Sequence, residues 1–394
     1  MSKKITIFTP TYNRAYCIHE LYKSLKRQSC MDFEWIILDD GSTDNTNQLC
    51  EKWIREDNTF EIIYIKTKNK GKMSAINKGV KLSTTPLFFI VDSDDYLLDD
   101  AIQWILQYSK EIQNDDNFAG ISGLRKIKSV EAKHNFDYID ATNLERRKYN
   151  LTMDMAECYK TDILRKYPAP EIESETYLSP TIVWNSIALD GYKIRWYNRV
   201  IYIAEYRPDG LTMAGSNKFK KNPIGWGKLI QINIKCRNDI EYSEFQYYLY
   251  YKEMKDNLSM DAICRNLEVP KNEMEEILLR KPRMIRLINK YFYDNEIKKI
   301  ALYGMGVEAK HFLQIAEDID VEICYGIDRR PNEVLTPCYK PTDTLPDVDA
   351  ILITNLRSEI SEIKINLAEY AEARSISLQK DILEKGFRYY FSDI

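Results

Sequence analysis

The sequence is poor in the residues that most often build metal centres and disulfide frameworks. Its eight cysteines are widely spaced and none forms a C-x-x-C pair, so the cysteine spacing of a metal site is absent. A disulfide framework is not expected in a chain of 394 residues. Histidine is scarce as well, with His19, His134 and His311 as its only examples. We therefore expect reduced thiols that are mostly buried.

Long apolar runs and an excess of basic charge are also missing. No segment approaches the roughly 20 apolar residues that a transmembrane helix needs, and residues 1–4 lead into a predicted strand without a signal-peptide segment. The 56 Lys and Arg residues are outnumbered by 60 Asp and Glu residues, for a formal charge of −4, which argues against a nucleic-acid partner. We expect a cytoplasmic protein and leave peripheral membrane contact open.

Two apolar runs of strand length end in clustered carboxylates. Residues 88–91 lead into Asp92-Ser93-Asp94-Asp95, and residues 35–38 lead into Asp39-Asp40. Buried parallel strands bring their carboxyl ends to one edge of an open α/β sheet, where ligands bind. A D-x-D sequence at that edge can hold a divalent cation that bridges phosphates. The pattern therefore predicts a metal–nucleotide pocket.

Residues 1–111 alternate between short apolar runs and helical patterns. Strands are predicted at residues 5–8, 34–38, 61–65 and 87–91, with helices between them and a further helix at 99–111. This β-α order implies a mostly parallel sheet with helices on both faces.

The pattern becomes mixed after residue 118. Short strands are predicted around a helix near 179–190, at residues 118–122, 153–159, 194–197 and 200–206. The polar segment 125–150 is expected to be a long loop, and long loops in compact domains are often functional.

Residues 216–295 show no strand alternation and are predicted to be helical. Within them, Val269-Pro270 separates two short helices, and we expect a packed helical hairpin there rather than a DNA-reading motif. A second α/β pattern begins at residue 297. The chain is therefore predicted to have three parts, at 1–215, 216–296 and 297–394.

The last part contains a glycine-rich turn after its first strand. Gly304-x-Gly306-x-x-Ala309, followed by Asp328, has the spacing of a dinucleotide-binding turn. Such a turn can bind a nucleotide at a helix N-terminus, or it can simply permit a tight connection between strand and helix. Both interpretations stay open.

Four motifs in residues 1–215, taken in order, resemble those of the family 2 glycosyltransferases of the GT-A fold. They are Thr9-Pro10-Thr11-Tyr12-Asn13-Arg14, Asp39-Asp40-Gly41-Ser42-Thr43-Asp44, Asn69-Lys70-Gly71-Lys72 with Ala75 and Asn77, and Asp92-Ser93-Asp94-Asp95. A further stretch, from Glu175 through Trp184 to Tyr206–Thr212, is similar to the acceptor-side segment of bacterial members. The resemblance implies an α/β GT-A fold, followed here by a helical region and a small Rossmann-like α/β domain.

The resemblance also implies an activity. The family transfers a sugar from a nucleotide-diphosphate donor, here expected to be UDP-linked, to a hydroxyl of a glycan or lipid-linked acceptor. It implies Mn²⁺ or Mg²⁺ as cofactor, inversion at the anomeric carbon, and a role in bacterial surface polysaccharide synthesis. A lipid-linked acceptor would bring the enzyme to the inner membrane face. Homo-oligomer formation stays open.

Site residues follow from the same resemblance. Asp94 would ligate the metal, which neutralises the leaving diphosphate, and Glu175 would be the base that takes the acceptor's proton. Glu173 is an alternative base, because the local sequence Glu171-Ile172-Glu173-Ser174-Glu175 offers three acids. The expected nucleotide-binding residues are Thr9, Pro10, Tyr12, Asp40, Lys72, Asp92 and Ser93.

Two other functions compete with this interpretation. A sugar nucleotidyltransferase shares a similar sheet but usually has a glycine-rich loop after its first strand, and residues 9–14 contain no glycine. A non-catalytic nucleotide-binding or scaffold protein would not need its acidic residues, whereas this chain retains Asp94 and the acids near residue 175.

Overall fold

The structure is a computed structural model that describes residues 3–56, 59–127, 135–205, 207, 210, 215, 217–331, 333–354, 360–368 and 373–383. The chain divides into two compact units, residues 1–236 and residues 237–394. Each unit is described by itself. The predicted three-part division at residues 215 and 296 remains a prediction.

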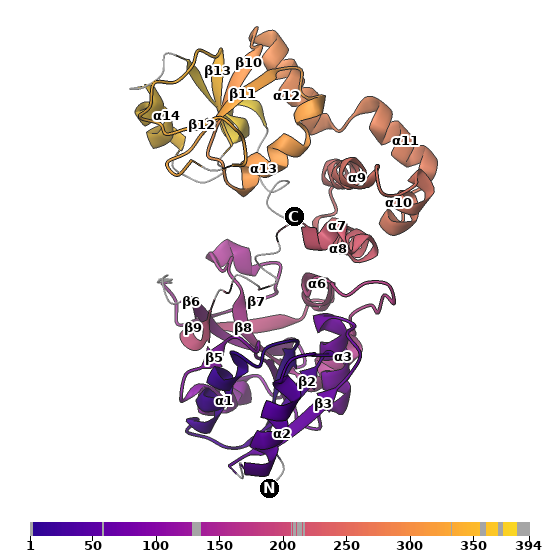
Figure 1. Cartoon of the computed structure of the whole chain (residues 1–394), viewed down its shortest axis with the longest axis vertical. Helices are drawn as coiled ribbons and strands as arrows, with labels where there is room; N and C mark the ends of the chain where they lie inside the picture. The colour runs from indigo at the N-terminus through magenta and orange to yellow at the C-terminus, as the bar shows by residue number, and fades with distance from the viewer. Residues whose placement is uncertain are drawn as a thin grey trace. The chain divides into compact units, whose positions relative to one another are not determined.

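The first unit is built on a nine-stranded mixed sheet with the order β3-β2-β1-β4-β8-β6-β9-β5, and β7 pairs with β9 (Figure 1). Strands β3, β2, β1 and β4 are parallel, whereas β8 is antiparallel to both β4 and β6. The strands are β1 (Ile5–Thr11), β2 (Phe33–Asp39), β3 (Glu61–Lys66), β4 (Leu87–Ile90), β5 (Tyr96–Leu97), β6 (Phe118–Ile127), β7 (Tyr138–Ala141), β8 (Met155–Lys160) and β9 (Lys193–Ala204).

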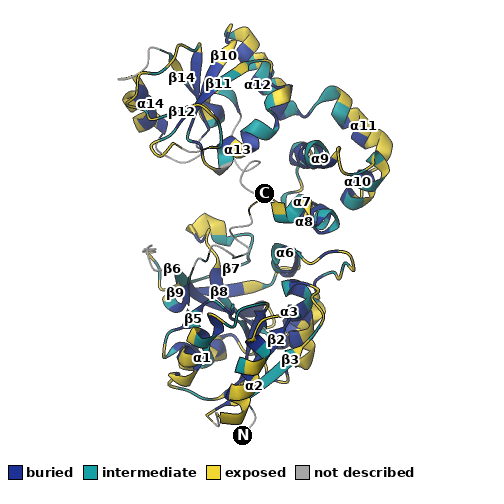
Figure 2. Ribbon diagram, viewed as in Figure 1, coloured by how far each residue is buried: buried dark blue, intermediate teal, exposed yellow. Residues whose placement is uncertain are grey.

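Helices cover both faces of this sheet. On one face, residues of α1, α2 and α4 pack with Trp35 and Phe89, and on the other, residues of α3, α5 and α6 pack with Phe8 and Phe88. Every residue of β1 and β2 is therefore buried, and Figure 2 shows these dark-blue strands beneath helices with exposed outer faces. This two-sided burial explains why the strands read as continuous apolar runs.

The helices of the first unit range from single 3-10 turns to the 15-residue α8, and α1 and α2 connect strands that are neighbours in the sheet. They are α1 (Ile18–Lys26), α2 (Thr46–Glu56), α3 (Lys72–Leu82), α4 (Ala101–Tyr108), η1 (Ser109–Glu111), η2 (Arg146–Tyr149), α5 (Thr161–Lys166), α6 (Thr181–Leu189), α7 (Asn217–Lys220) and α8 (Pro223–Arg237).

Two expectations for this unit were wrong. The segment 125–150 is not one long loop, because it contains the end of β6, all of β7 and the 3-10 helix η2. β7 has only four residues, with Ile139 and Ala141 toward the core. Its partner lies about 55 residues away in β9, so this short alternation does not distinguish it from a loop. The two strands expected at 194–206 are one continuous strand, β9.

The second unit begins with helices and ends with a five-stranded parallel sheet. Helix α9 packs against α10, α11, α12 and α13. The sheet has the order β12-β11-β10-β13-β14, with all strands parallel. The elements are α9 (Ile240–Met254), α10 (Met260–Leu267), α11 (Lys271–Arg280), α12 (Arg283–Asp294), β10 (Lys299–Tyr303), α13 (Val307–Gln314), η3 (Ala316–Asp318), β11 (Glu322–Ile327), β12 (Cys338–Tyr339), β13 (Ala350–Ile353), α14 (Ile360–Ala368), β14 (Arg374–Ser377) and η4 (Leu378–Ile382).

The predicted fold class is confirmed: a mostly parallel mixed sheet flanked by helices, then a helical region, then a small parallel α/β sheet. All eight cysteines are free, and four of them are buried. No helix in the described part of the chain has the length and apolar character needed to span a membrane.

Candidate active site

The loops that follow β1 and β2 are tied together at the carboxyl edge of the sheet. The two strands are in parallel register up to the pair Thr11 and Asp39, and Asp40 then donates its N–H to the Thr11 carbonyl at 2.8 Å. One step further, the Asn13 N–H donates to Ser42 Oγ at 2.8 Å, and the Thr43 N–H donates to Asn13 Oδ1 at 2.8 Å. The first two motifs thus form one polar surface.

Asp40 connects this surface to the start of α3. Its two carboxylate oxygens accept the N–H groups of Lys70 and Gly71 at 2.8 and 2.7 Å, and the residue is only 6% exposed. Burial raises the pKa of Asp40, and the two N–H groups oppose that rise only in part. A carboxylate that accepts N–H groups at a helix start stabilises that end of the helix.

Gly71 brings a distant loop against this helix start. Its φ of 89° and ψ of 161° lie in a region that is essentially restricted to glycine. A Cβ atom on Gly71 would lie 1.8 Å from the Thr176 carbonyl oxygen. The acidic loop around residue 175 therefore packs directly on the backbone at the start of α3, and only a residue without a side chain permits it.

A second link fixes the beginning of the acidic loop. The Asn77 side chain donates to the Ala169 carbonyl at 2.8 Å and accepts the Ala169 N–H at 2.9 Å. Asn77 lies in α3 and is 7% exposed. The motif residues of α3 therefore position the acidic loop at two points, which explains why glycine and asparagine occur in that pattern.

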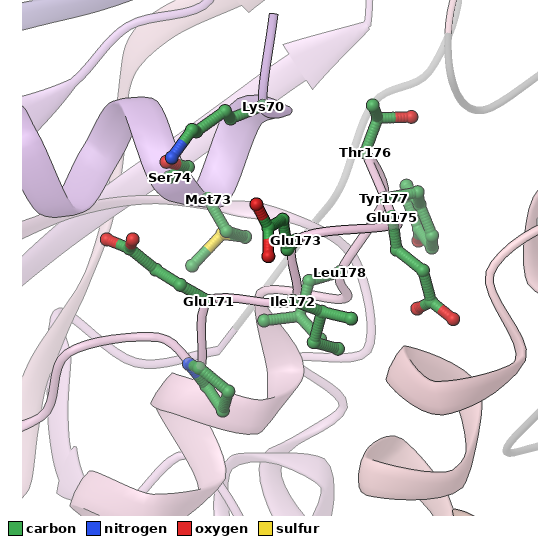
Figure 3. A pocket seen from close by; sticks show the side chains of 11 residues that line it. Lys70, Met73, Ser74, Glu171, Ile172, Glu173, Glu175, Thr176, Tyr177 and Leu178 are labelled. Carbon is green, nitrogen blue, oxygen red and sulfur yellow. The ribbon is translucent and has the colours of Figure 1, made fainter.

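A cavity of about 260 Å³ lies between the start of α3 and the acidic loop. Lys70 and Ser74 line it from one side, and Glu171 and Glu173 line it from the other (Figure 3). Glu173 is exposed, and the figure shows its carboxylate on the side of α3. Carboxylates that converge with a lysine and a hydroxyl on one cavity could hold a polar, hydroxyl-rich group.

The side chain of Glu175 faces away from Glu173, as Figure 3 shows. Its two oxygens accept the N–H groups of Ile224 and Gly225, both at 2.7 Å, at the start of α8. Asn222 Oδ1 accepts the N–H groups of Thr176 and Tyr177 at 3.0 Å. Glu175 thus caps a helix, and its oxygens keep only their remaining lone pairs for other partners.

The acidic turn after β4 is surrounded by cations. Lys72 Nζ donates to Asp92 Oδ1 at 2.5 Å, and Arg125 Nη2 lies 3.8 Å from Asp92 Oδ2. Burial alone would raise the pKa of Asp92, but Lys72 and Arg125 outweigh it and lower that pKa. For Asp94, burial and the neighbouring Asp92 charge raise the pKa.

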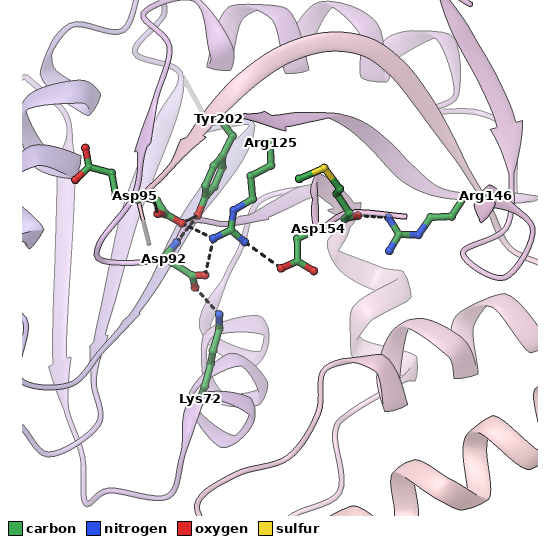
Figure 4. Close-up of polar contacts among 9 residues, drawn as sticks. Lys72, Asp92, Asp95, Arg125, Arg146, Asp154 and Tyr202 are labelled. Carbon is green, nitrogen blue, oxygen red and sulfur yellow. Dashed lines mark hydrogen bonds and ion pairs between the residues drawn. The ribbon is translucent and has the colours of Figure 1, made fainter. Parts of the chain in front are cut away.

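Asp95 is the most tightly held residue of this turn. It is 1% exposed, and its Oδ2 accepts Arg125 Nη2 and the Tyr202 hydroxyl, both at 2.7 Å. Its Oδ1 accepts the Glu205 N–H at 2.8 Å. Figure 4 shows Arg125 between the acidic turn and Asp154. Burial is the main reason that the pKa of Asp95 rises to about 6.

The structure brings several predicted site residues together. Asp40 accepts the N–H groups of Lys70 and Gly71, the two residues before Lys72. Lys72 donates to Asp92, and the loop of Glu175 packs on Gly71. Tyr12 lies at the same edge with 45% of its surface exposed.

Three other predicted residues offer little accessible side chain. Thr9 accepts the Trp35 indole N–H at 2.9 Å inside the core, and Pro10 and Ser93 are buried. The roles of all these residues remain predictions.

Sequence reasoning missed Arg125, Tyr202 and Asn222. Arg125 and Tyr202 meet Asp95 from strands β6 and β9, at sequence distances of 30 and 107 residues. No local motif marks such partners. Arg125 is followed directly by Lys126, and both lay in the segment assigned to a loop, so the sequence offered no signal that singled out Arg125.

Part of the predicted acceptor-side segment cannot be placed. Tyr206, Pro208, Asp209, Leu211 and Thr212 lie outside the described residues, and so does His134.

The donor atoms suit a divalent cation that arrives with phosphate. Among the described residues no group of three or more His, Cys, Asp or Glu side chains could hold a metal alone. Asp94 is half-buried, and no other side chain of the described residues bonds to its carboxylate. Mg²⁺-like cations are commonly bound by one or two carboxylates plus substrate phosphates and water. Asp94, with Asp92 beside it, fits that donor set.

The fold and site together define an α/β domain that gathers carboxylates and a lysine at the carboxyl edge of parallel strands, as nucleotide-binding sheets do. Residues 6–161 match the sequence model of the family described as glycosyl transferase family 2. These residues form a glycosyl transferase family 2 domain, which confirms the resemblance inferred from the motifs.

Several known proteins are similar to parts of this chain. Glycosyltransferase GlyG of Streptococcus pneumoniae is 31% identical over 111 residues, which cover 28% of this chain and 36% of that protein. The GalNAc(5)-diNAcBac-PP-undecaprenol beta-1,3-glucosyltransferase of Campylobacter jejuni is 21% identical over 321 residues, covering 76% and 96%. The crystal structure of S. aureus TarS 1–349 with UDP-GlcNAc is similar at a TM-score of 0.47 and 19% identity, covering 64% of this chain and 73% of TarS.

Proposed function

We propose that the chain transfers a sugar from a nucleoside-diphosphate donor, UDP-linked, to a hydroxyl of a glycan or lipid-linked acceptor. The observation that carries the proposal is the meeting of Asp40, Lys72 and Asp92 at one sheet edge of a family 2 domain. The positions proposed below for the nucleotide, the diphosphate, the cation and the base are all given relative to that edge.

The donor's nucleotide would lie on the surface formed by the first two motifs. The exposed Tyr12 ring offers a flat face for a base, and Asp40 keeps one lone pair on each oxygen for a base N–H. Pro10, and the backbone at Thr9 and Ser93, would shape this subsite.

The diphosphate would lie at the start of α3. Lys72 is the first residue of that helix, where backbone N–H groups and the helix dipole favour anions. Its ammonium group, which contacts Asp92 in this structure, is close enough to the acidic turn to bind phosphate oxygens there.

Mn²⁺ or Mg²⁺ would be held by Asp94, with Asp92 beside it. A bound divalent cation supplies charge neutralisation for the diphosphate as it leaves. Asp94 is the carboxylate of the acidic turn that the described side chains leave open, whereas Asp95 is 1% exposed and accepts hydrogen bonds from Arg125, Tyr202 and the Glu205 N–H.

Two glutamates compete for the role of base. Glu175 is the residue implied by the family, but both of its oxygens cap α8. Glu173 is exposed on the cavity beside Lys70 and has the freer carboxylate. A base that takes the proton of the acceptor hydroxyl during attack would give a single displacement, and hence inversion.

The proposed setting is the assembly of a bacterial surface polysaccharide. Support comes from the Campylobacter relative, whose name specifies an undecaprenol-linked acceptor and whose length is almost fully covered by the alignment. A lipid-linked acceptor would place a cytoplasmic enzyme at the inner membrane face, as a peripheral protein.

The first test is a donor screen. Purified protein with Mn²⁺ is incubated with UDP-, GDP-, dTDP- and CMP-sugars, and released nucleotide is measured. We expect hydrolysis of one UDP-sugar and its loss in Asp94→Ala, while Asp116→Ala, which removes an exposed carboxylate, retains it. Absence of both hydrolysis and nucleotide binding by calorimetry would favour the scaffold alternative.

A second test separates the two glutamates. If Glu175 is the base, Glu175→Gln retains donor binding and loses transfer, while Glu173→Gln stays active. The reverse result, an inactive Glu173→Gln with an active Glu175→Gln, would assign the base to Glu173 and leave Glu175 as the cap of α8. Thermal melting of both variants controls for the loss of that cap, which costs about 1 kcal/mol.

A further inference from the structure

Two carboxylates of the acidic turn, Asp94 and Asp95, differ in how many hydrogen-bond donors they have. Asp94 has no bond from another side chain among the described residues, whereas Asp95 has three donors and is 1% exposed. Three of its roughly four acceptor directions are used, and a carboxylate that is 1% exposed is not open to a cation arriving from solvent. Asp95 is therefore built into the protein, and its partners decide the shape of the turn.

Arg125 is the partner that joins the turn to the central strands. Its backbone pairs with that of Tyr202 across β6 and β9, and its guanidinium lies over the Tyr202 ring at 5.1 Å. The same guanidinium lies 2.7 Å from Asp95 and 3.8 Å from Asp92. Arg125 and Tyr202 thus form one support beside the turn (Figure 4).

Tyr202 extends this support to the turn's backbone. Its hydroxyl donates to Asp95 Oδ2 at 2.7 Å and accepts the Asp92 N–H at 3.0 Å. The Asp95 N–H in turn donates to the Asp92 carbonyl at 3.2 Å. The position of Asp92, and with it that of Asp94, therefore depends on contacts made by Arg125 and Tyr202.

Arg125 also neutralises part of the negative charge of the acidic turn. Three carboxylates within four residues repel one another, and Arg125 places a half-buried positive charge against two of them. Lysine would supply the charge, but not the planar group that stacks on a ring while its N–H groups face two carboxylates.

We propose that Arg125 is a positioning residue of the transferase: through Asp95 and Tyr202 it holds the acidic turn in the shape in which Asp92 and Asp94 receive the cation and diphosphate. This inference rests on the proposed function. It concerns a residue outside the four motifs, on a strand that none of them includes.

The test measures the gain in nucleoside-diphosphate affinity that Mn²⁺ provides. Calorimetry is carried out with UDP, GDP, CDP and dTDP, each with and without Mn²⁺, on the full chain. In Arg125→Lys we expect the Mn²⁺-dependent gain to fall about tenfold while affinity without metal stays unchanged. The control is Arg195→Lys, because Arg195 also forms a forked pair, with Asp140 on β7.

A double-mutant cycle tests the route of the effect. If Arg125 acts through Asp95, Arg125→Lys and Asp95→Asn lose the same gain, and the double variant loses no more than either alone. Tyr202→Phe, which removes one hydroxyl, gives a milder loss of the same kind and serves if Arg125→Lys does not fold.

Three results would overturn the inference. An unchanged Mn²⁺-dependent gain in Arg125→Lys would show that the turn keeps its shape without the guanidinium. Fully additive losses would show that Arg125 acts independently of Asp95, for instance by direct contact with the donor. An equal loss without metal would show a merely structural role. If the wild-type protein shows no Mn²⁺-dependent affinity for any of the four nucleotides, the proposed metal-dependent function falls together with this inference.

Discussion

In each unit of this chain an aspartate directly follows the second strand of the parallel sheet, and the two aspartates have different surroundings. Asp40, after β2, accepts N–H groups from Lys70 and Gly71, residues of another loop. Asp328, after β11, accepts the N–H groups of Met305, in the glycine-rich turn after β10, and of Arg330, two residues ahead in its own turn.

The neighbouring strands make the difference larger. In the first unit, β4 lies next to β1 and leads into four residues with three carboxylates, which contact Lys72 and Arg125. In the second unit, β13 lies next to β10 and leads into Thr354, whose hydroxyl donates to the carbonyls of Tyr303 and Gly304. Similar parallel topology thus supports a charged edge in one unit and, over the described residues, a largely self-satisfied edge in the other. Topology provides the place for a site, and the charged side chains decide whether one is there.

The largest effect is expected from one positive-φ glycine at each of these edges, Gly71 and Gly304. Gly71→Ala should cost at least about 3 kcal/mol, because backbone strain adds to the overlap with Thr176, and donor turnover should be abolished. Gly304→Ala, at a φ of 85°, should cost about 1–2 kcal/mol and leave turnover unchanged. Urea unfolding and turnover check both. An active Gly71→Ala would mean that the acidic loop need not contact α3.

A smaller effect is expected from the two aspartates themselves. Asp40→Ala leaves two N–H groups without acceptors, at a cost of about 1–3 kcal/mol, and should lower donor turnover about 10- to 100-fold. Asp328→Ala should lower stability without changing turnover, as unfolding curves and initial rates would show. Equal losses of turnover in the two variants would contradict the contrast between the edges.

The smallest effect concerns buried carboxylates with opposite pKa shifts. Burial raises the pKa of Asp95 from 3.8 to about 6, so its contribution to stability is full below pH 4 and is lost as pH rises through about 6. Asp318 in the second unit is also affected by burial, but Tyr248 and Lys252 outweigh it and lower the pKa. Its contribution is therefore present above pH 4 and lost as pH falls through the depressed value.

The measurement is urea unfolding of Asp95→Asn and Asp318→Asn at pH 4 and pH 7. Relative to the wild-type protein, Asp95→Asn should gain about 2 kcal/mol between pH 4 and pH 7. Asp318→Asn should stay nearly level over that range, and a further measurement below pH 4 should show its stability deficit shrinking as Asp318 of the wild-type protein is protonated. Changes of the same sign in both variants would show that the two carboxylates do not differ in this way.

The sequence by itself determined the alternation of strands and helices, the carboxylates that follow β2 and β4, and the match of residues 6–161 to glycosyl transferase family 2. These features are local: apolar runs buried on both faces, turn residues at fixed spacing, and acids directly after strands. Such patterns can be recognised in the sequence because each depends on residues a few positions apart.

Only the tertiary structure decided which of these residues meet, and in what state. It brought the loop of Glu175 onto Gly71, turned the Glu175 carboxylate toward the start of α8, and enclosed Asp95 with Arg125 and Tyr202. It also replaced the expected loop at 125–150 with strands that belong to the sheet. Residues that make contact across 30 to 107 positions form no recognisable motif in the sequence. The packing of the strands brings them together, and the length of chain between them does not.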